Sequence, residues 1–374
     1  MIPIVQPTLH DFEGVVRDFQ QAWESGQVTT GVFTRQFEQA VEEKLQVPHA
    51  VMVQSCTAGL MLALKALELK GEVILPAFTW TATAHSVVWN GLTPVFADIT
   101  RGTYTLNPVA AAAAITPRTA AIMPVNVFGC PPDYEALAQV AQENRLPLVY
   151  DSAQGLGSRF RHPDGAWHYS GGCGEAEVFS LSPTKVVSAM EGGLITTLNG
   201  GLAQKLRQMR DYGKAIDGED IAWLGLSARA PEINAIVARH NFAHVDELVA
   251  RRQQIVRVYQ DALKGLPGIT FQEIPARYRS SYNYFTLFID PAKTRCSRDK
   301  ICEFLKDQGI QAKKYFHPAL HLQQVYRELG FTYQGRLPIT EAAAAGGLAL
   351  PLYSHMTEGT VLQVVGALKG ILET

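Results

Sequence analysis

Lys185 and Asp151 are the residues whose types and positions point most directly to chemistry. Lys185 closes the segment 178–185, a few residues before a Glu-Gly-Gly run, and Asp151 ends an apolar run earlier in the chain. A lysine amine can form a Schiff base with the aldehyde of pyridoxal phosphate, and an upstream aspartate can hold the ring nitrogen of that cofactor protonated. The pair therefore predicts pyridoxal phosphate chemistry, with Lys185 and Asp151 as catalytic residues.

A phosphate-binding loop is expected at residues 54–58, where a strand passes into a helix. Backbone N–H groups and the macrodipole at a helix start suit a phosphate, which makes Cys56, Thr57 and Ala58 candidates, with the Thr57 hydroxyl as a further donor. The alternative is an ordinary helix cap. A hydroxyl of Ser180, on a short strand before Pro183, can reach the same phosphate.

Two further residues are candidates for contacts with the cofactor ring. Trp80 follows the expected strand 72–75, and ligands of open α/β sheets bind at the carboxyl edge, where an aromatic ring can stack on a heterocycle. Core packing is the alternative for this segment. Gln154 follows Asp151 closely enough to contact the ring substituents. Each segment alone is weak, since a lone lysine is usually a solvated surface residue and Asp151 could be a turn or helix cap. The order of the segments, each at a strand end, favours the cofactor.

The elements that must position these residues alternate along the first half of the chain. We expect strands at 49–54, 72–75, 93–97, 120–125 and 146–150, separated by helices at 58–69, 82–89, 108–114 and 134–143. Strands flanked by helices at this spacing predict an α/β fold with an open, mostly parallel sheet and helices on both faces. Residues 177–181 and 193–197 are expected to extend that sheet.

The pattern changes after residue 200. From Pro231 to Tyr259, apolar residues recur at intervals of three and four. This spacing, with proline at its start, predicts one long helix that links two domains. A strand at 284–289, a helix at 297–308 and a terminal helix at 358–372 then predict a smaller α+β domain. We place the boundary between a large cofactor-binding domain with an N-terminal arm, 1–248, and a small C-terminal domain, 249–374.

Composition restricts the partners. The 374 residues are 47% hydrophobic and 18% charged, with a net charge of −2, so there is no electrostatic footprint for nucleic acid or an anionic membrane. The chain lacks a recognisable leader and an apolar run long enough to span a bilayer, and we expect a cytoplasmic protein with small-molecule partners. The five scattered cysteines disfavour a disulfide framework or a structural zinc site. The histidine pairs His317/His321 and His240/His244 have chelating spacing, but without an H-E-x-x-H pattern we expect no metal.

Together the motifs resemble the DegT/StrS family of fold type I sugar aminotransferases. The matching segments are Thr-Thr-Gly-x-Phe-Thr-x-x-Phe-Glu at 29–38, then 74–83, 94–98, 151–154, 179–185, 191–193, 315–318 with His321, and 350–352 before 356–358. The resemblance implies a large domain with a seven-stranded type of sheet and a smaller C-terminal domain. It also implies that the chain is a transaminase. A related branch with histidine in place of the lysine dehydrates sugars, so Lys185 favours transamination.

The resemblance also implies roles for individual residues. These are Lys185 as the Schiff-base lysine, Asp151 at the ring nitrogen, Trp80 as the stacking ring, Thr57, Ala58 and Ser180 at the phosphate, and Gln154 near the ring. It further implies a homodimer with shared sites, in which the segment around Ser227 reaches the neighbouring cofactor. Cys56, Asn126, Met190 and Ser227 depart from the residues most common in the family.

The sequence hypothesis is a ping-pong aminotransferase in amino sugar biosynthesis. Glutamate or glutamine would donate the amino group, the cofactor would cycle between pyridoxal and pyridoxamine phosphate, and a keto sugar, expected to be nucleotide-linked, would accept it. Candidates for contacts with the acceptor are Arg229, Lys313, Lys314, Tyr315 and His317. Two alternatives remain at this point. The acceptor could be a cyclitol or another non-nucleotide ketone, or the chain could be a catalytically silent scaffold.

Overall fold

One seven-stranded sheet dominates the computed structural model, which describes residues 1–294, 296–331 and 336–373. In spatial order its strands are β3 (Thr93–Ala97), β2 (Glu72–Pro76), β4 (Thr119–Ile122), β5 (Val149–Asp151), β8 (Ala176–Ser180), β9 (Gly193–Thr197) and β1 (His49–Val53). Parallel bridges from Ile122 to Leu148 and from Val125 to Asp151 join the β3-β2-β4 ladder to the β5-β8-β9-β1 ladder. Only β9 runs antiparallel to its neighbours, so the predicted mostly parallel sheet is confirmed.

Helices cover both faces of this sheet because successive strand residues point to opposite sides. Val51 and Val53 of β1 pack in the core under α3 (Cys56–Ala66) and α7 (Gly200–Met209), whereas Ala50 and Met52 pack in the core under α2 (Val32–Leu45) and α8 (Glu232–Phe242). On the β2 side, α4 (Thr81–Trp89) lies on one face and α6 (Tyr134–Asn144) on the other. The strands are therefore buried on both faces and read as continuous apolar runs.

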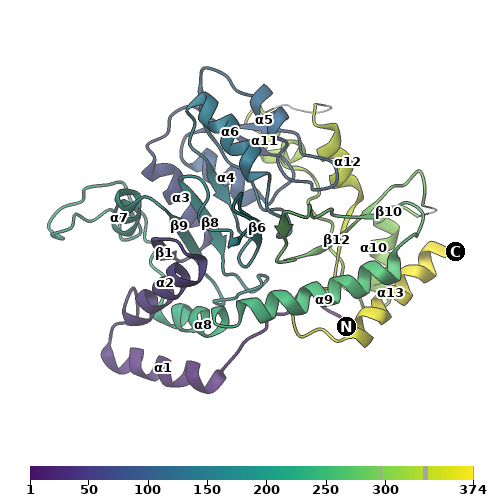
Figure 1. The fold of residues 1–374 in the computed structure, drawn as a ribbon, viewed down its shortest axis with the longest axis horizontal. Helices are drawn as coiled ribbons and strands as arrows, with labels where there is room; N and C mark the ends of the chain where they lie inside the picture. Colours follow the sequence, from purple (N-terminus) through teal and green to yellow (C-terminus); the bar gives the residue numbers. More distant parts are fainter. Residues whose placement is uncertain (295, 332–335, 374) are drawn as a thin grey trace.

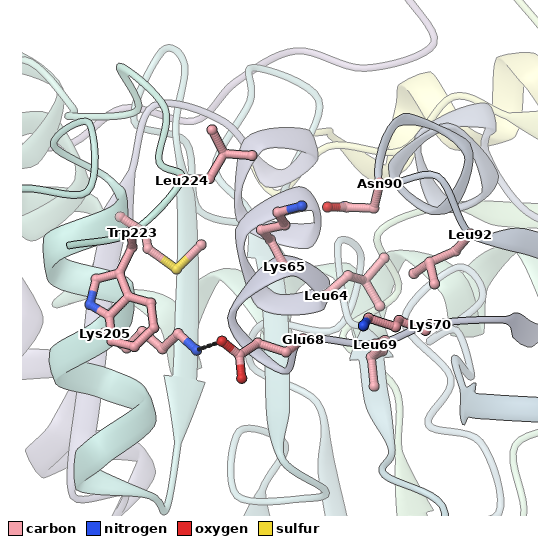
Figure 2. Close-up of a pocket in the computed structure, with 11 residues that line it drawn as sticks. Leu64, Lys65, Glu68, Leu69, Lys70, Asn90, Leu92, Lys205, Trp223 and Leu224 are labelled. Carbon is pink, nitrogen blue, oxygen red and sulfur yellow. Dashed lines mark ion pairs between the residues drawn. The ribbon is translucent and has the colours of Figure 1, made fainter. Parts of the chain in front are cut away.

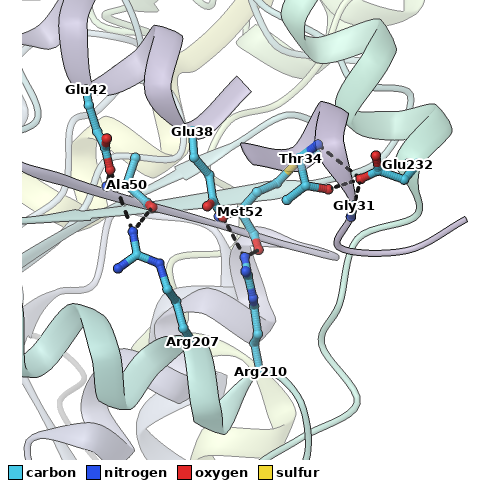
Figure 3. A network of polar contacts seen from close by, with 9 residues as sticks. All are labelled: Gly31, Thr34, Glu38, Glu42, Ala50, Met52, Arg207, Arg210 and Glu232. Atoms are coloured by element: carbon cyan, nitrogen blue, oxygen red, sulfur yellow. Dashed lines mark hydrogen bonds and ion pairs between the residues drawn. The ribbon is translucent and has the colours of Figure 1, made fainter. Parts of the chain in front are cut away.

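The free edge of β1 is satisfied by side chains rather than by another strand. Glu38 accepts the N–H of Met52 at 2.8 Å, and the Arg210 guanidinium bonds both Glu38 Oε1 (2.6 Å) and the Met52 carbonyl (2.7 Å). Figure 3 shows a similar arrangement at Ala50. Glu42 accepts the Ala50 N–H at 2.9 Å, and Arg207 donates to the Ala50 carbonyl at 3.1 Å. An edge covered in this way cannot template pairing with another chain.

A buried carboxylate ties the N-terminal region to α8. Glu232 accepts the N–H groups of Gly31 (2.8 Å) and Thr34 (3.0 Å), as well as the Thr34 hydroxyl (Figure 3). It also accepts the Phe33 N–H at 2.8 Å. These N–H groups lie at the start of α2, which has no side-chain cap of its own. The Glu232 carboxylate therefore accepts hydrogen bonds from N–H groups that have no partner within the helix. Before α2, α1 (Phe12–Ser25) packs on α8 (Figure 1).

The long helix predicted from Pro231 to Tyr259 is wrong in one respect, because it is two helices. The structure has α8, which ends at Phe242, and α9 (Val245–Leu263), with a break at Ala243 and His244. There the His244 ring stacks on His10 of the N-terminal arm, with centroids 4.1 Å apart, and the His244 N–H bonds the Asn241 carbonyl. The apolar spacing continues through the break, so periodicity alone does not detect it.

A second, antiparallel sheet follows, in the order β10 (Ile269–Phe271), β12 (Phe285–Ile289) and β13 (Gly347–Leu350). The core on it includes residues of α9, α10 (Arg298–Asp307) and α13 (Glu358–Glu373), and Figure 1 shows α9 and α13 side by side. Val245, Leu248 and Val249 of α9 pack in the large-sheet core, while Ile255, Val256 and Tyr259 pack here. Helix α9 thus changes core between Val249 and Ile255.

The remaining elements are short. They are α5 (Pro108–Ala113), α11 (Gln324–Glu328), α12 (Pro338–Gly346), the 3-10 turn η1 (Leu320–Leu322) and a third sheet of β11 (Tyr278–Arg279), β6 (Arg159–Arg161) and β7 (Trp167–Tyr169). Within the described residues, no helix combines the length and the apolarity needed to cross a membrane.

Candidate active site

The carboxyl ends of the parallel strands bring the predicted residues to one edge of the large sheet. There β1 leads into α3, β2 leads to Trp80 before α4, β5 ends at Asp151, and β8 ends at Ser180 before Lys185. These segments surround a cavity of about 280 Å³. Nine residues predicted from the sequence line it, namely Cys56, Thr57, Trp80, Asp151, Gln154, Ser180, Lys185, Lys313 and Tyr315.

The start of α3 presents unpaired donors to this cavity. Ser55 caps the helix, and its Oγ accepts the Ala58 N–H at 3.1 Å. Within the described residues, the N–H groups of Cys56 and Thr57 have no protein acceptor, and both residues line the cavity. Two N–H groups and the positive end of the macrodipole suit an anion. Burial raises the pKa of the Cys56 thiol well above its usual value, helped by Asp151 and opposed by Lys185, so the thiol stays protonated.

Asp151 is a buried carboxylate held by hydrogen bonds. Thr83 donates its hydroxyl to Oδ2 at 2.6 Å, and the Ala153 N–H donates to Oδ1 at 3.1 Å. Burial raises the pKa of Asp151, while Thr83, Ala153 and the Lys185 charge oppose that increase. A cationic N–H group placed in the cavity would oppose it further, because it favours the ionised form.

Gln154 presents a hydrogen-bond donor to the cavity. Its Oε1 accepts the Phe128 N–H at 2.6 Å. Because a backbone N–H can only donate, this contact identifies the oxygen of the amide and leaves the NH2 group as the free end. Gln154 thus offers a donor for an oxygen substituent of a bound ring.

The charge of Lys185 affects the pKa of three other groups in the site. Its charge opposes the increase in pKa that burial causes at Asp151 on β5, Cys56 on α3 and Tyr284 just before β12. These groups come from three separate segments of the chain, and Lys185 and all three line the cavity. A lysine amine and a buried carboxylate therefore face one enclosed space, as the sequence predicted.

The mouth of the cavity is aromatic and carries one further lysine. Trp80 is 55% exposed, and its ring meets Tyr315 edge-on at 6.3 Å. Lys313 Nζ lies 5.8 Å from the centroid of the Trp80 ring and 4.8 Å from that of Tyr315. The Tyr315 hydroxyl is 3.4 Å from that of Tyr284. A flat ligand can stack here with a cation beside it.

Five predicted residues do not line the cavity in the single chain. Ala58 is buried in α3 with its N–H bonded to Ser55, and Ser227 lies exposed in the segment between α7 and α8. Arg229 pairs with Asp211 at 3.2 Å and lies over the Tyr212 ring. Lys314 pairs with Asp299 at 2.8 Å, and His317 is exposed. Of the two adjacent lysines, the cavity therefore receives Lys313.

Neither histidine pair considered from the sequence converges on a common point. His321 is fully buried and lies 3.1 Å from Glu341, whereas His317 is exposed. His240 contacts Asp11 and Asp18 through opposite ring nitrogens, at 2.9 and 2.8 Å, and His244 stacks on His10. The two histidines of each pair therefore contact separate partners and do not face one shared position for a metal ion.

Sequence reasoning missed residues that support the site from outside the motifs. Thr83 was quoted within a motif but given no role, although its hydroxyl contacts both Asp151 and Thr79, the latter at 2.9 Å. The spacing of Thr79 and Thr83, four apart across the first turn of a helix, was the available signal. Tyr284 comes from the distant C-terminal half, and no local pattern could have assigned it to this cavity.

A buried polar network lies behind the cavity wall. Asn126, which lines the cavity, donates to the Tyr134 hydroxyl at 3.3 Å, and Tyr134 lies 3.1 Å from Glu177 Oε1. Ser152, next to Asp151, donates to the same oxygen at 3.2 Å. Burial raises the pKa of Glu177 to about 7. This network holds the β4 and β5 ends together.

A second hollow shows that size alone does not select the site. It has a volume of about 530 Å³ and lies at the C-terminal end of α3, where Figure 2 shows Lys205 of α7 paired with Glu68 beside Trp223. The pair is 3.2 Å apart, and Lys205 Nζ lies 4.0 Å from the Trp223 ring centroid. None of the predicted site residues lines this hollow.

Known proteins share both the sequence and the fold. The dTDP-4-amino-4,6-dideoxy-D-glucose transaminase of Escherichia coli is 31% identical over 370 residues, spanning 99% of this chain and 98% of that protein. DesI, solved in the presence of its TDP-sugar product, has a TM-score of 0.91 and 34% identity, covering 98% of this chain and 92% of that one. Spr1654 from Streptococcus pneumoniae, solved in a PLP-form, has a TM-score of 0.90 and 26% identity, covering 100% and 98%. A family model matches residues 12–369, and the chain belongs to the DegT/DnrJ/EryC1/StrS aminotransferase family.

Proposed function

We propose that this chain is a sugar aminotransferase that moves an amino group from glutamate or glutamine to a keto sugar, with pyridoxal phosphate bound in the cavity. The observation that carries the proposal is the meeting of Lys185 and Asp151 in one cavity beside the donors at the start of α3. The E. coli relative, named for a dTDP-linked amino sugar, and DesI, solved with its TDP-sugar product, support a nucleotide-linked acceptor.

The residues present fit the cofactor. Cys56 and Thr57 offer N–H groups to its phosphate, and Ser180 offers a hydroxyl from across the cavity. Ala58 contributes to the same helix start, although its N–H is already bonded to Ser55. The free NH2 group of Gln154 would donate to the ring oxygen, and Trp80 would stack on the ring.

When bound, pyridoxal phosphate supplies an aldehyde for amines and a ring that withdraws electrons from the reacting carbon. Asp151 would hold a proton at the ring nitrogen, and that charge pair would offset the cost of burying the carboxylate. Lys185 would hold the cofactor through its aldehyde and, as a free amine, would move a proton at the substrate carbon.

We propose a two-stage, ping-pong exchange in which donor and acceptor use the same cavity in turn. The cofactor would carry the amino group between the stages, and Lys185 would shuttle the proton in both. The acceptor is expected to enter past Trp80, with Tyr315 and Lys313 at the mouth. The Lys313 charge would attract the diphosphate of a nucleotide sugar.

A homodimer with shared sites is proposed for the remaining predicted residues. Ser227 and Arg229 do not line the cavity of their own chain, and their exposed segment can reach the cavity of a second copy. Lys314 and His317 lie beside the mouth lysine in the chain and are retained as outer contacts for the acceptor. A cytoplasmic location and the domain boundary at 248/249 also remain our predictions.

Transfer of isotope from a labelled donor tests this function. Wild-type protein should move ¹⁵N from glutamate or glutamine to a keto nucleotide sugar, and Lys185→Ala should lose at least about 10²-fold in rate because its proton carrier is gone. Lys293→Ala, which removes an exposed lysine paired with Asp290 outside the cavity, is the matched control and should retain most of the activity.

The same assay separates the two acceptor classes. Free keto sugars and keto cyclitols run beside nucleotide-linked ones would be poorer acceptors if the nucleotide is recognised. Equal or better transfer to a cyclitol would replace the nucleotide-sugar assignment by the alternative. Transfer by Lys185→Ala at the wild-type rate would remove the basis of the whole proposal.

A further inference from the structure

Three side chains with metal-ligating atoms meet on the hairpin formed by β6 and β7. His162 and Asp164 lie in its loop, and His168 lies on β7 directly opposite Phe160 of β6. His162 and His168 are too far apart in sequence for helical chelation, so only the hairpin brings them together. Their ring centroids lie 5.0 Å apart, and the ligand atoms of all three residues lie within 4.8 Å of one another.

The loop holds the Asp164 carboxylate close to the His162 and His168 rings. Asp164 Oδ1 accepts the Ala166 N–H at 2.8 Å, which fixes the side chain across the turn. Its other oxygen, Oδ2, lies 3.1 Å from His162 Nδ1 and 4.0 Å from His168 Nε2. Asp164 Oδ2 is therefore the shared centre of the group.

His168 carries an unused ring nitrogen at this point. His168 Nε2 is buried and has no hydrogen-bond partner among the described residues, although the side chain as a whole is 36% exposed. A buried nitrogen without a partner costs free energy. A ligand on the side of Asp164 would satisfy it.

We propose that His162, Asp164 and His168 bind one divalent transition-metal ion of the zinc class. Two imidazole nitrogens and one carboxylate oxygen form a ligand set that zinc accepts, with water completing the coordination. Tetrahedral bonds of about 2.1 Å separate the ligand atoms by about 3.4 Å. Binding therefore requires side-chain rotations that draw the three ligand atoms closer together, His168 toward Asp164 in particular.

The neighbouring charges are compatible with a cation here. Arg161, which precedes the site on β6, donates to the Gly165 carbonyl at 3.3 Å on the same loop. Arg159, two residues earlier, is held by Tyr169 at 2.6 Å and Asp246 at 2.7 Å. Both guanidiniums thus have acceptors of their own, and Asp164 is the carboxylate directed at the two imidazoles.

The proposed ion would stabilise the hairpin and take no part in amino transfer. None of the three ligands lines the cavity that holds Lys185 and Asp151. An ion that binds the folded hairpin and not the unfolded chain raises the temperature of unfolding. The inference is thus independent of the proposed function, and either can fail alone.

Titration of the untagged, cofactor-loaded protein with Zn²⁺ tests the site. By calorimetry, wild type should bind one ion per chain at this site, and its melting temperature should rise with Zn²⁺. Asp164→Asn and His168→Ala should each weaken that binding at least about tenfold and lose the thermal shift. Mg²⁺, which prefers oxygen ligands, should produce neither effect.

His244→Ala is the matched control, because His244 is another partly exposed histidine but stacks on His10 away from the hairpin. It should bind Zn²⁺ like wild type. Unchanged binding in both Asp164→Asn and His168→Ala would assign the ion to other groups and overturn the proposal, as would a wild-type protein that binds no Zn²⁺. Amino transfer should be the same in all variants, which keeps loss of folding distinct from loss of the site.

Discussion

Asp151 illustrates how single residues in this site are tuned by opposing effects. Burial favours the neutral acid, whereas the Thr83 hydroxyl, the Ala153 N–H and the Lys185 charge favour the carboxylate. The proposed role at a ring nitrogen needs the carboxylate. The balance therefore depends on neighbours contributed by α4 and by the lysine segment as well as by its own strand.

Glu177 gives a pH-dependent prediction. Burial raises its pKa to about 7, so the folded protein binds a proton that the unfolded chain has released above the ordinary glutamate pKa of about 4.3. The raised pKa of Glu177 therefore makes the free energy of unfolding largest at low pH, where the carboxyl is protonated in both states. This contribution to stability is lost as pH rises to about 7. Glu177→Gln, which resembles the protonated acid, should match wild type near pH 5 and exceed it near pH 8 by up to about 3 kcal/mol.

Urea unfolding of both proteins at the two pH values measures this difference. Glu143→Gln, at an exposed position on α6, should show no such change. A Glu177→Gln offset that is the same at pH 5 and pH 8 would contradict a raised pKa at Glu177.

The residues that sequence reasoning identified were those within continuous motifs. Asp151 ends a strand, and Lys185, Gln154, Thr57 and Trp80 each follow one, so their meeting at one edge could be predicted from the order of elements. Tyr284 could not be predicted, because it reaches the cavity from just before a strand of the other sheet. The choice of Lys313 over Lys314 depends on the pairing of Lys314 with Asp299, which no local pattern reveals.

At the scale of elements, the sheet edge at β1 depends on two arginines with very different surroundings. Arg210 and Glu38 form a buried pair at 2.6 Å, whereas Arg207 is partly exposed and lies 3.6 Å from Glu42. Both arginines end α7 and reach carbonyls of β1 (Figure 3). Since β1 leads directly into the start of α3, this edge supports the proposed phosphate loop.

Arg210→Met should therefore cost about 3–5 kcal/mol in the free energy of unfolding, because Glu38 would remain buried without its partner. Arg207→Met is the matched control and should cost less than about 1 kcal/mol. Equilibrium urea unfolding gives both values. Equal costs for the two variants would show that burial does not distinguish these pairs.

Element types were largely predictable, and element breaks were not. The expected strands and helices of the large sheet are present because each strand is an apolar run bounded by polar turns. The α8–α9 break escaped prediction because the apolar spacing continues through it, and the His10 ring that stacks on His244 at the break is far away in the sequence. Helices α1 and α2 and strand β13 were not predicted at all.

At the scale of the whole molecule, the family and the structure confirm the fold type I class. The large sheet carries the candidate site at its carboxyl edge, and two tyrosines from the C-terminal half of the chain also line the cavity: Tyr284, just before β12, and Tyr315, between α10 and η1. Helix α9 spans both cores, so the two halves share one continuous element. Movement between the halves would change the width of the cavity mouth.

Mixed dimers test whether two copies share their sites. If Arg229 serves the partner's cavity, Lys185→Ala and Arg229→Ala proteins, each inactive alone, should recover about a quarter of wild-type activity after subunit exchange. Each mixed dimer would then contain one intact site. Lys214→Ala also removes a partner of Asp211 and should keep its activity alone, as a control for damage to this segment. No recovery after demonstrated exchange would count against shared sites.

The central claim is that Lys185 and Asp151 form a working pyridoxal phosphate site. The most direct measurement is the visible absorption spectrum of the purified protein with added pyridoxal phosphate, before and after excess glutamate or glutamine. We predict a band of lysine-bound cofactor that the donor bleaches, and no such band in Lys185→Ala. A wild-type protein without the band, or a Lys185→Ala protein with it, would contradict the account.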